Sequence, residues 1–223
     1  LLEEYVESER ENLADLIRSD INDKRSYAAR RLLEEMCAGE RYGVGRMGAA
    51  KDVEKISFQK LNSYYLDILP KGRLELFYCG SAPEKRVAGA FTRAFAALPR
   101  QGGLEPAATI RRPAREPFQV VVDEMDVSQG KLCIGFRTDS ADIPATMLMN
   151  AMFGGTSNSK LFLNVREKLS LCYYAGSAYH RLKGLITVSS GIEFENYDRA
   201  VEEIFRQLES LQKGEWEDWE LTG

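Results

Sequence analysis

Residues 153–180 read FGGTSNSKLFLNVREKLSLCYYAGSAYH, and the rest of the chain is organised around this stretch. Gly154 and Gly155 are expected to end an apolar helix, because glycine adopts the left-handed conformation at little cost. The polar TSNS run that follows offers caps for a second, short helix, and a strand comes next. Arg166 and Tyr173 lie near the junction of that helix and that strand, so this junction is the candidate site.

The composition is that of an ordinary soluble globular protein. The 223 residues carry a net charge of −4, with 44% hydrophobic and 29% charged residues. The acidic balance argues against a nucleic-acid surface, and no run approaches the about 18 consecutive apolar residues of a membrane helix. Neither nucleic acid nor a membrane is therefore expected as a partner. Because an acidic helix already runs at Leu1, we expect a fragment that lacks an N-terminal part.

The cysteines and the single histidine form no metal-binding pattern. Cys37, Cys79, Cys133 and Cys172 are far apart and make no C-x-x-C pair. We expect buried free thiols in a reducing compartment, hence a cytoplasmic location, and a zinc site built from them is a remote alternative. His180 has no second His or Cys near it in the sequence and is expected to be structural or exposed.

The first half of the chain is predicted to be mainly helical. The expected elements are helices at 3–19, from the Ser26 cap to Gly39, at 58–69 and at 84–98, and a strand at 73–79. The acidic run of the first helix indicates a solvated face, although carboxylates are also metal ligands. Residues 99–117 are rich in proline and show no hydrophobic period, so they are the expected linker between two domains.

The second half predicts the order β-β-α-α-β-β-α. The expected elements are a hairpin of strands at 118–127 and 131–138, helices at 145–153 and 160–169, strands at 171–180 and 185–193, and a helix at 196–212. This order is typical of the α+β class, with an antiparallel sheet and helices packed on one face.

The motifs of the central stretch resemble the C-terminal-domain signature of the pitrilysin/insulinase (inverzincin) family of zinc peptidases, in particular its mitochondrial-processing-peptidase-like branch. The matching motifs are Gly154-Gly155, Leu161-Phe162, Val165-Arg166-Glu167 and Leu171-Cys172-Tyr173. Residues 39–48 and the end of the 73–79 segment also resemble this family. The resemblance implies that residues 1–98 are the C-terminal part of one α+β domain and that residues 118–223 are most of a second.

The resemblance also implies a role for Arg166 and Tyr173. In the family, an Arg and a Tyr of this motif reach across a cavity and bind the substrate backbone near the scissile bond. The chemistry is suitable, because a guanidinium stays charged and offers several N–H donors, and a phenol can donate one hydrogen bond. Without the resemblance, the residues alone favour a simpler arrangement, in which Arg166 pairs with a nearby Glu and Tyr173 packs in the sheet.

The metal half of such an active site is not expected in this chain. Catalytic members carry H-x-x-E-H on a helix, and one histidine cannot supply it. The family's third metal ligand, a Glu, falls on Leu16 when the sequences are aligned without gaps, and Glu9 or Glu11 could replace it only if the alignment shifts. We therefore assign no catalytic residue, metal ligand or cofactor here, although catalytic members use zinc.

Three functions remain open at this point. The first is a non-catalytic subunit that binds polypeptide through Arg166 and Tyr173 and complements a zinc-bearing paralogue, as a heterodimer or by self-association. The second is an active zinc endopeptidase whose H-x-x-E-H motif lies upstream of Leu1. The third is a scaffold or assembly protein without a peptide site.

Overall fold

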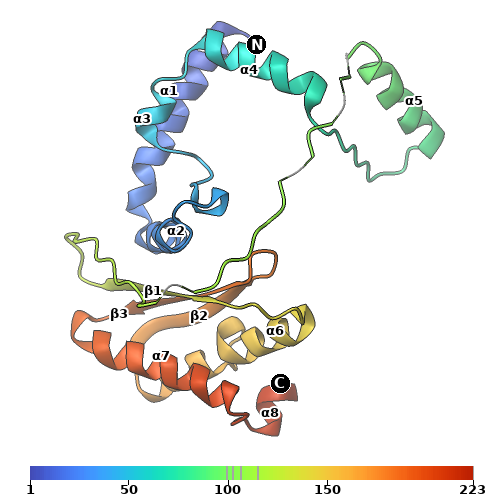
Figure 1. Ribbon diagram of the computed structural model, residues 1–223. Coiled ribbons are helices and arrows are strands. Elements are labelled where there is room, and N and C mark those ends of the chain that lie inside the picture. Colours follow the sequence, from blue (N-terminus) through green and yellow to red (C-terminus); the bar gives the residue numbers. More distant parts are fainter. Residues whose placement is uncertain (99, 102, 106, 115, 223) are drawn as a thin grey trace. The chain divides into compact units, whose positions relative to one another are not determined.

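A three-stranded antiparallel sheet, in the order β1-β3-β2, forms the centre of the C-terminal part of this computed structural model (Figure 1). The strands are β1 (Gly130–Arg137), β2 (Cys172–His180) and β3 (Leu185–Ile192). The middle strand, β3, pairs with β1 and with β2 along its whole length. The three strands expected at 131–138, 171–180 and 185–193 are thus present, and the α+β class is confirmed.

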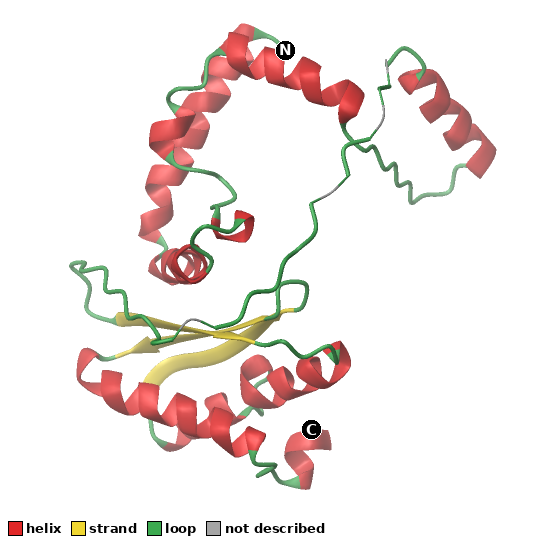
Figure 2. Ribbon diagram, in the orientation of Figure 1, coloured by secondary structure: helices red, strands yellow, loops and turns green. Residues whose placement is uncertain are grey.

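Helices account for most of the other regular elements (Figure 2). The α-helices are α1 (Glu3–Ser19), α2 (Lys24–Met36), α3 (Ala50–Val53), α4 (Phe58–Lys71), α5 (Glu84–Phe95), α6 (Ile143–Asn150), α7 (Tyr197–Gln212) and α8 (Asp218–Thr222). The 3-10 helices are η1 (Asp20–Asn22), η2 (Arg41–Gly43) and η5 (Phe194–Asn196), and the π-helices are η3 (Ala151–Gly155) and η4 (Leu161–Lys168). Within the described ranges, no helix has both the length and the apolar character needed to cross a membrane.

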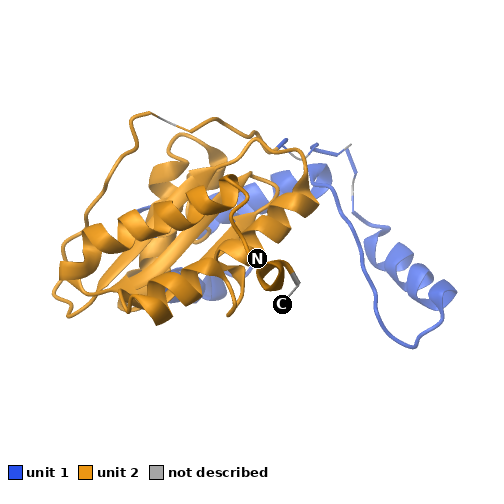
Figure 3. Cartoon of the chain, turned by 90° about the horizontal axis from the view of Figure 1, so that it is seen from below, with its two compact units in different colours: residues 1–16, 49–108 blue, residues 17–48, 109–223 orange. Residues whose placement is uncertain are grey.

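The structure describes residues 1–98, 100–101, 103–105, 107–114 and 116–222, and the chain divides into two units of packed residues (Figure 3). Unit 1 contains residues 1–16 and 49–108, and unit 2 contains residues 17–48 and 109–223. Residues 99, 102, 106 and 115 of the expected linker lie outside the described ones. These units reflect packing and do not test the expected boundary at 99–117, which stays a prediction.

The main core of unit 2 lies on one face of the sheet. Alternate residues of β3 point to this face, and Ile186, Val188 and Ile192 are at most 4% exposed. Phe153 of η3 and Ile204 of α7 are fully buried against them. Burial of one such side chain stabilises the fold by roughly 1.5–3 kcal/mol. The expected helical layer on one face is therefore formed by α6, α7, η3 and η4.

The helix α2 packs on the other face of the sheet and adds a second helical layer to unit 2. A β-carbon on Gly135 of β1 would lie 2.5 Å from the sulfur of Met36, so α2 approaches the strand closely. The guanidinium of Arg137, also on β1, donates to the backbone carbonyl of Met36 at 2.6 Å. Arg25 of α2 stacks over the ring of Tyr174 of β2, with 4.2 Å between the guanidinium carbon and the ring centroid.

A buried charge cluster fixes the end of α2 to the sheet. The carboxylate of Glu40 accepts hydrogen bonds from Arg137 and Lys183, and these three side chains are only 3–7% exposed. Burial by itself would raise the pKa of Glu40, but the hydrogen bonds from Lys183 and Arg137 hold this pKa below its ordinary value. The cluster joins the segment after α2, the end of β1 and the β2–β3 turn.

The segments 73–79 and 118–127, which were expected to be strands, form no strand in the structure. Phe77 is 85% exposed and Phe118 is 78% exposed, and no strand among the described residues pairs with either segment. The prediction was wrong because β-propensity reflects packing on a neighbouring strand, and the sequence does not show whether that neighbour is present.

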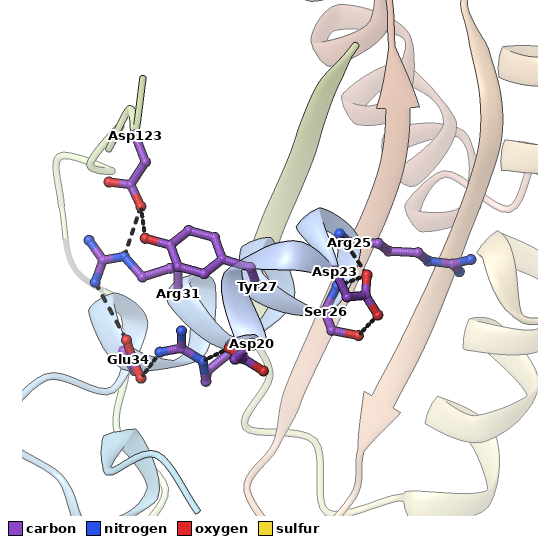
Figure 4. Close-up of polar contacts among 9 residues, drawn as sticks. Asp20, Asp23, Arg25, Ser26, Tyr27, Arg31, Glu34 and Asp123 are labelled. Carbon is purple, nitrogen blue, oxygen red and sulfur yellow. Dashed lines mark hydrogen bonds and ion pairs between the residues drawn. The ribbon is translucent and has the colours of Figure 1, made fainter. Parts of the chain in front are cut away.

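The segment around Asp123 is instead held by α2. The carboxylate of Asp123 accepts hydrogen bonds from the hydroxyl of Tyr27 and the guanidinium of Arg31, both at 3.0 Å (Figure 4). The N-cap of α2 also differs from the expected Ser26. Asp23 is the cap, since its carboxylate accepts from the backbone N–H groups of Arg25 and Ser26 (Figure 4). Asp23 therefore caps the start of α2, and Asp123 is bound by side chains further along the same helix.

Gly154 is required for close packing rather than for a left-handed turn. Neither Gly154 nor Gly155 is among the described glycines with positive φ, so the expected left-handed stop is wrong. A β-carbon on Gly154 would lie 2.6 Å from the backbone nitrogen of Ser177 on β2 and 2.8 Å from a methyl carbon of Leu161. Gly154 therefore allows the backbone of η3 to lie directly against β2.

Gly154→Ala is therefore expected to destabilise the protein by about 1–3 kcal/mol, because backbone atoms of β2 cannot move aside as a flexible side chain can. Urea denaturation measures this change. The matched control is Gly103→Ala, since a β-carbon on Gly103 meets nothing within 4 Å. Its stability should change by less than about 0.5 kcal/mol, and equal effects of the two substitutions would contradict the packing account.

The burial of His180 leads us to expect that the stability of the protein depends on pH. Its Nδ1 lies 3.0 Å from the hydroxyl of Tyr42 and its Nε2 lies 3.2 Å from the hydroxyl of Thr187. Burial lowers the pKa of His180 below the ordinary value of about 6.5. The unfolded chain thus takes up the proton first, so this stabilising contribution is present above the ordinary pKa and is lost as the pH falls towards the folded pKa.

The wild type is expected to lose more stability than His180→Gln between pH 7.5 and pH 5.5. The difference is at most about 1.4 kcal/mol per pH unit, and it is smaller here because the imidazole is only half-buried. Urea denaturation of both proteins at the two pH values gives the change in the free energy of unfolding of each. Groups other than His180 titrate in both proteins, so their contribution cancels when the two changes are subtracted. Parallel losses in the two proteins would show that His180 does not titrate as described.

Candidate functional site

Arg166 and Tyr173 line the same open hollow in unit 2, with a volume of about 440 Å³. Its walls come from the end of η4, the segment Ser170–Tyr173 and Glu193, which follows β3. The structure therefore brings the two expected site residues together. It also brings Glu193 to the same hollow, a side chain that the sequence did not indicate.

Arg166 is carried by a π-helix where a regular α-helix was expected. The backbone N–H of Leu169 donates to the carbonyl of Asn164 at 3.1 Å, which is an i→i+5 bond. Leu161 and Val165 are fully buried and anchor η4 to the core. Turns of this wide type occur often at functional sites, because they change the direction of the side chains that follow.

A buried polar network holds η4 against α7. The amide of Asn164 donates to the side-chain oxygen of Gln207 at 3.0 Å, and the amide of Gln207 donates to Glu203 at 2.6 Å. Gln207 is 4% exposed and Glu203 is 7% exposed. Burial would raise the pKa of Glu203, but hydrogen bonds from Arg206 and Gln207 keep this pKa below its ordinary value. The site helix is therefore positioned by a network whose buried members are paired.

The guanidinium of Arg166 is half-exposed at the rim of η4 and remains available to a ligand. It lies over the ring of Phe162, with 4.6 Å between the guanidinium carbon and the ring centroid. It also pairs with Glu167 at 3.4 Å, as the residues alone had suggested. An exposed ion pair of this kind contributes about 0–1 kcal/mol. A ligand carbonyl or carboxylate can therefore compete for the guanidinium.

The chain turns sharply from η4 into β2. Ser170 has φ +49°, a left-handed conformation that is uncommon for residues other than glycine. The backbone N–H of Leu171 donates to the carbonyl of Val165 at 3.0 Å, and Leu171 is 2% exposed. A strained residue of this kind costs on the order of 1 kcal/mol and persists where the surrounding packing imposes it.

A one-residue bulge directs Tyr173 out of the sheet. Cys172 is opposite Ile192 and Tyr174 is opposite Gly191, so two steps along β2 match one step along β3. Strict alternation with the buried Ala175 would turn Tyr173 towards the core. The bulge instead leaves Tyr173 57% exposed on the wall of the hollow. The simpler arrangement, with Tyr173 packed in the sheet, is not what the structure shows.

Glu193 accepts a hydrogen bond from the hydroxyl of Tyr173, with 2.5 Å between the two oxygens. This bond to a carboxylate is the main reason why the pKa of Tyr173 is raised. Glu193 lies 20 residues from Tyr173 in the sequence and belongs to no motif of the central stretch. Only the register of the β2–β3 hairpin, in which Cys172 is opposite Ile192, could have placed it there.

The described residues do not fit a zinc ion. No group of three His, Cys, Asp or Glu side chains that could hold a metal is found among them. Leu16, which the ungapped alignment was expected to place at the family's third ligand, lies on α1, and its side chain has no lone pair to offer. Glu9 and Glu11 are exposed on the same helix. No reaction step is therefore assigned to a metal held by this part of the chain.

Residues 55–223 match the family model described as the peptidase M16 inactive domain. A protein of Bacillus subtilis (strain 168), named "Probable inactive metalloprotease YmfF", is 37% identical over 225 residues, which cover 98% of this chain and 52% of that protein. The chain therefore spans about half the length of this relative.

Solved structures agree with this match. A conserved protein from Enterococcus faecalis V583 is 28% identical with a TM-score of 0.81, covering 97% of this chain and 52% of that one. The peptidase M16 inactive domain from Pseudomonas fluorescens has a TM-score of 0.71 at 17% identity, covering 98% of this chain and 54% of that one, and it supports the fold alone. The likeness to the mitochondrial-processing-peptidase branch stays a prediction. The expected pitrilysin/insulinase relationship is confirmed, and the chain belongs to the peptidase M16 family.

Proposed function

We propose that this chain is a non-catalytic, peptidase-like subunit that binds polypeptide through Arg166 and Tyr173. The observation that carries the proposal is the bulge in β2, which takes Tyr173 out of the sheet and exposes it on the hollow that Arg166 also lines. Bulges are frequent beside active sites, where they redirect a side chain. A bulge, a left-handed Ser170 and a π-helix within one short stretch are costly to keep without a role.

The chemistry of the hollow suits a peptide backbone. Arg166 presents a charged donor group for a carbonyl, and the phenol of Tyr173 and the carboxylate of Glu193 present oxygens. These groups lie at the end of a strand hairpin, so an extended polypeptide could run across several of them. The site offers recognition groups for such a ligand, and no set of three side chains that could hold a metal is found there or elsewhere among the described residues.

Cleavage of a bound polypeptide would then require a second chain. A zinc-bearing paralogue would supply the hydrolytic chemistry. The name of the relative from Bacillus subtilis, a probable inactive metalloprotease, supports the non-catalytic part of this proposal. The match of residues 55–223 to an inactive domain supports it as well.

Arg166→Ala is expected to weaken peptide binding about tenfold, because a charge-assisted hydrogen bond is lost, and Tyr173→Phe is expected to weaken it about threefold. Fluorescence anisotropy with the fluorescein-labelled nonapeptide AKALAFAKA gives both affinities. Circular dichroism checks that each variant remains folded.

The matched controls are Arg199→Ala and Tyr197→Phe, which change exposed side chains of α7 outside the hollow. Both should bind the probe as the wild type does. Unchanged affinity in Arg166→Ala and Tyr173→Phe would remove the peptide site and favour a scaffold role. Zinc-dependent cleavage of the probe by the isolated protein would overturn the non-catalytic assignment.

A further inference from the structure

Glu193 controls what the hydroxyl of Tyr173 can offer to a ligand. A phenol has one proton to donate and two lone pairs that accept. That proton is directed to the carboxylate of Glu193, across the end of the β2–β3 hairpin. We propose that Glu193 is the third residue of the peptide site and that Tyr173 meets a bound polypeptide as a hydrogen-bond acceptor for a backbone N–H. This inference rests on the proposed function of Arg166 and Tyr173.

The bond between Tyr173 and Glu193 is expected to persist when a peptide binds. A hydrogen bond to a carboxylate is roughly twice as strong as one to a neutral carbonyl, so the hydroxyl would lose by turning to a peptide carbonyl. In the described part of the chain, no ion pair to Glu193 is found that would compete for its charge. Arg166, a cation that lines the same hollow, is paired with Glu167 instead.

The sheet holds the backbone on both sides of the hydrogen bond between Tyr173 and Glu193. The bulge fixes the backbone of Tyr173, and Ile192, directly before Glu193, is 3% exposed in the core. Both ends of the hydrogen bond are therefore held by the sheet. The phenol is 57% exposed, and the side chain of Gln129 acts on its oxygen as a hydrogen-bond donor. One of its two lone pairs is therefore left for a ligand while its proton is engaged by Glu193.

This arrangement defines the chemistry of the ligand. Arg166 can only donate, and it suits a backbone carbonyl. Tyr173 accepts, and it suits a backbone N–H. An extended polypeptide presents both groups along one edge, as it does when it joins a sheet. The amide facing Tyr173 must carry its hydrogen, so proline or an N-methylated residue at that one position should be rejected.

The first test is the titration of Tyr173, followed by NMR of protein labelled with 13C at the ring carbon that bears the hydroxyl. Because Glu193 raises the pKa of Tyr173, Glu193→Gln should lower this pKa towards its ordinary value. Glu195→Gln, an exposed carboxylate two residues further on, is the matched control and should leave it unchanged. The side chain of Gln129, which lowers the pKa of Tyr173, is unchanged in both variants.

The second test is a scan of the probe AKALAFAKA with one N-methyl group at each backbone position in turn. In the wild type, one position should lose about three- to tenfold in affinity, the range of one net hydrogen bond. In Tyr173→Phe the same N-methyl group should cost less than about twofold, because no acceptor is left to lose. Glu193→Ala should also reduce the penalty, since it frees the hydroxyl to donate.

The outcomes separate this inference from the proposed function. If Arg166→Ala does not change the affinity, or if the probe does not bind, the proposed peptide site fails, and the inference fails with it. If Arg166→Ala weakens binding while every N-methyl group costs the same in the wild type and in Tyr173→Phe, the acceptor role alone is overturned. An unchanged pKa of Tyr173 in Glu193→Gln would overturn the role of Glu193.

Discussion

The pairing of β2 with β3, including its one-residue bulge at Tyr173, is the constraint on which the candidate site depends. β3 is paired on both sides and buries Ile186, Val188 and Ile192 in the core, so its register cannot slip without turning these side chains to the opposite face. With the register fixed, the bulge leaves one residue of β2 unmatched, and that residue is Tyr173. The same register brings Glu193 beside it, which no local sequence feature requires.

The elements that were predicted correctly are those whose signal is local. The strands β1, β2 and β3 alternate and are bounded by turn residues, and α1, α4 and α7 show helical periods. The segment 118–127 has an equally strong strand signal, yet Asp123 is held by Tyr27 and Arg31 of α2. Its secondary structure depends on a distant neighbour, which periodicity does not report. The π-helices escaped prediction because an i→i+5 bond changes the backbone and leaves the composition unchanged.

The candidate site was also predictable only where its residues are close together in the sequence. Arg166 and Tyr173 belong to a contiguous motif, so resemblance to a family pointed to them. Glu193 lies beyond a complete strand and turn, and its position follows only from the pairing of β2 with β3. Simple alternation with the buried Ala175 would place Tyr173 on the core face, yet Tyr173 is exposed. The reason is the bulge, which interrupts the alternation of side chains at Tyr173. The left-handed Ser170 and the bulge at Tyr173 are therefore the features that periodicity in the sequence did not predict.

In the proposed function, peptide binding depends on unit 2, whereas the residue that the ungapped alignment places at a metal-ligand position lies in unit 1. This separation makes a non-catalytic subunit physically reasonable. Leu16 belongs to unit 1, whereas Arg166, Tyr173 and Glu193 belong to unit 2. The three polar side chains are positioned by the core around Phe153, Val165 and Ile192, and none of these contacts needs a metal. Replacing a zinc ligand in unit 1 by leucine would leave that core unchanged. A family member could thus lose a metal ligand in unit 1 and keep the proposed peptide site, because the core that positions Arg166, Tyr173 and Glu193 is built from residues of unit 2.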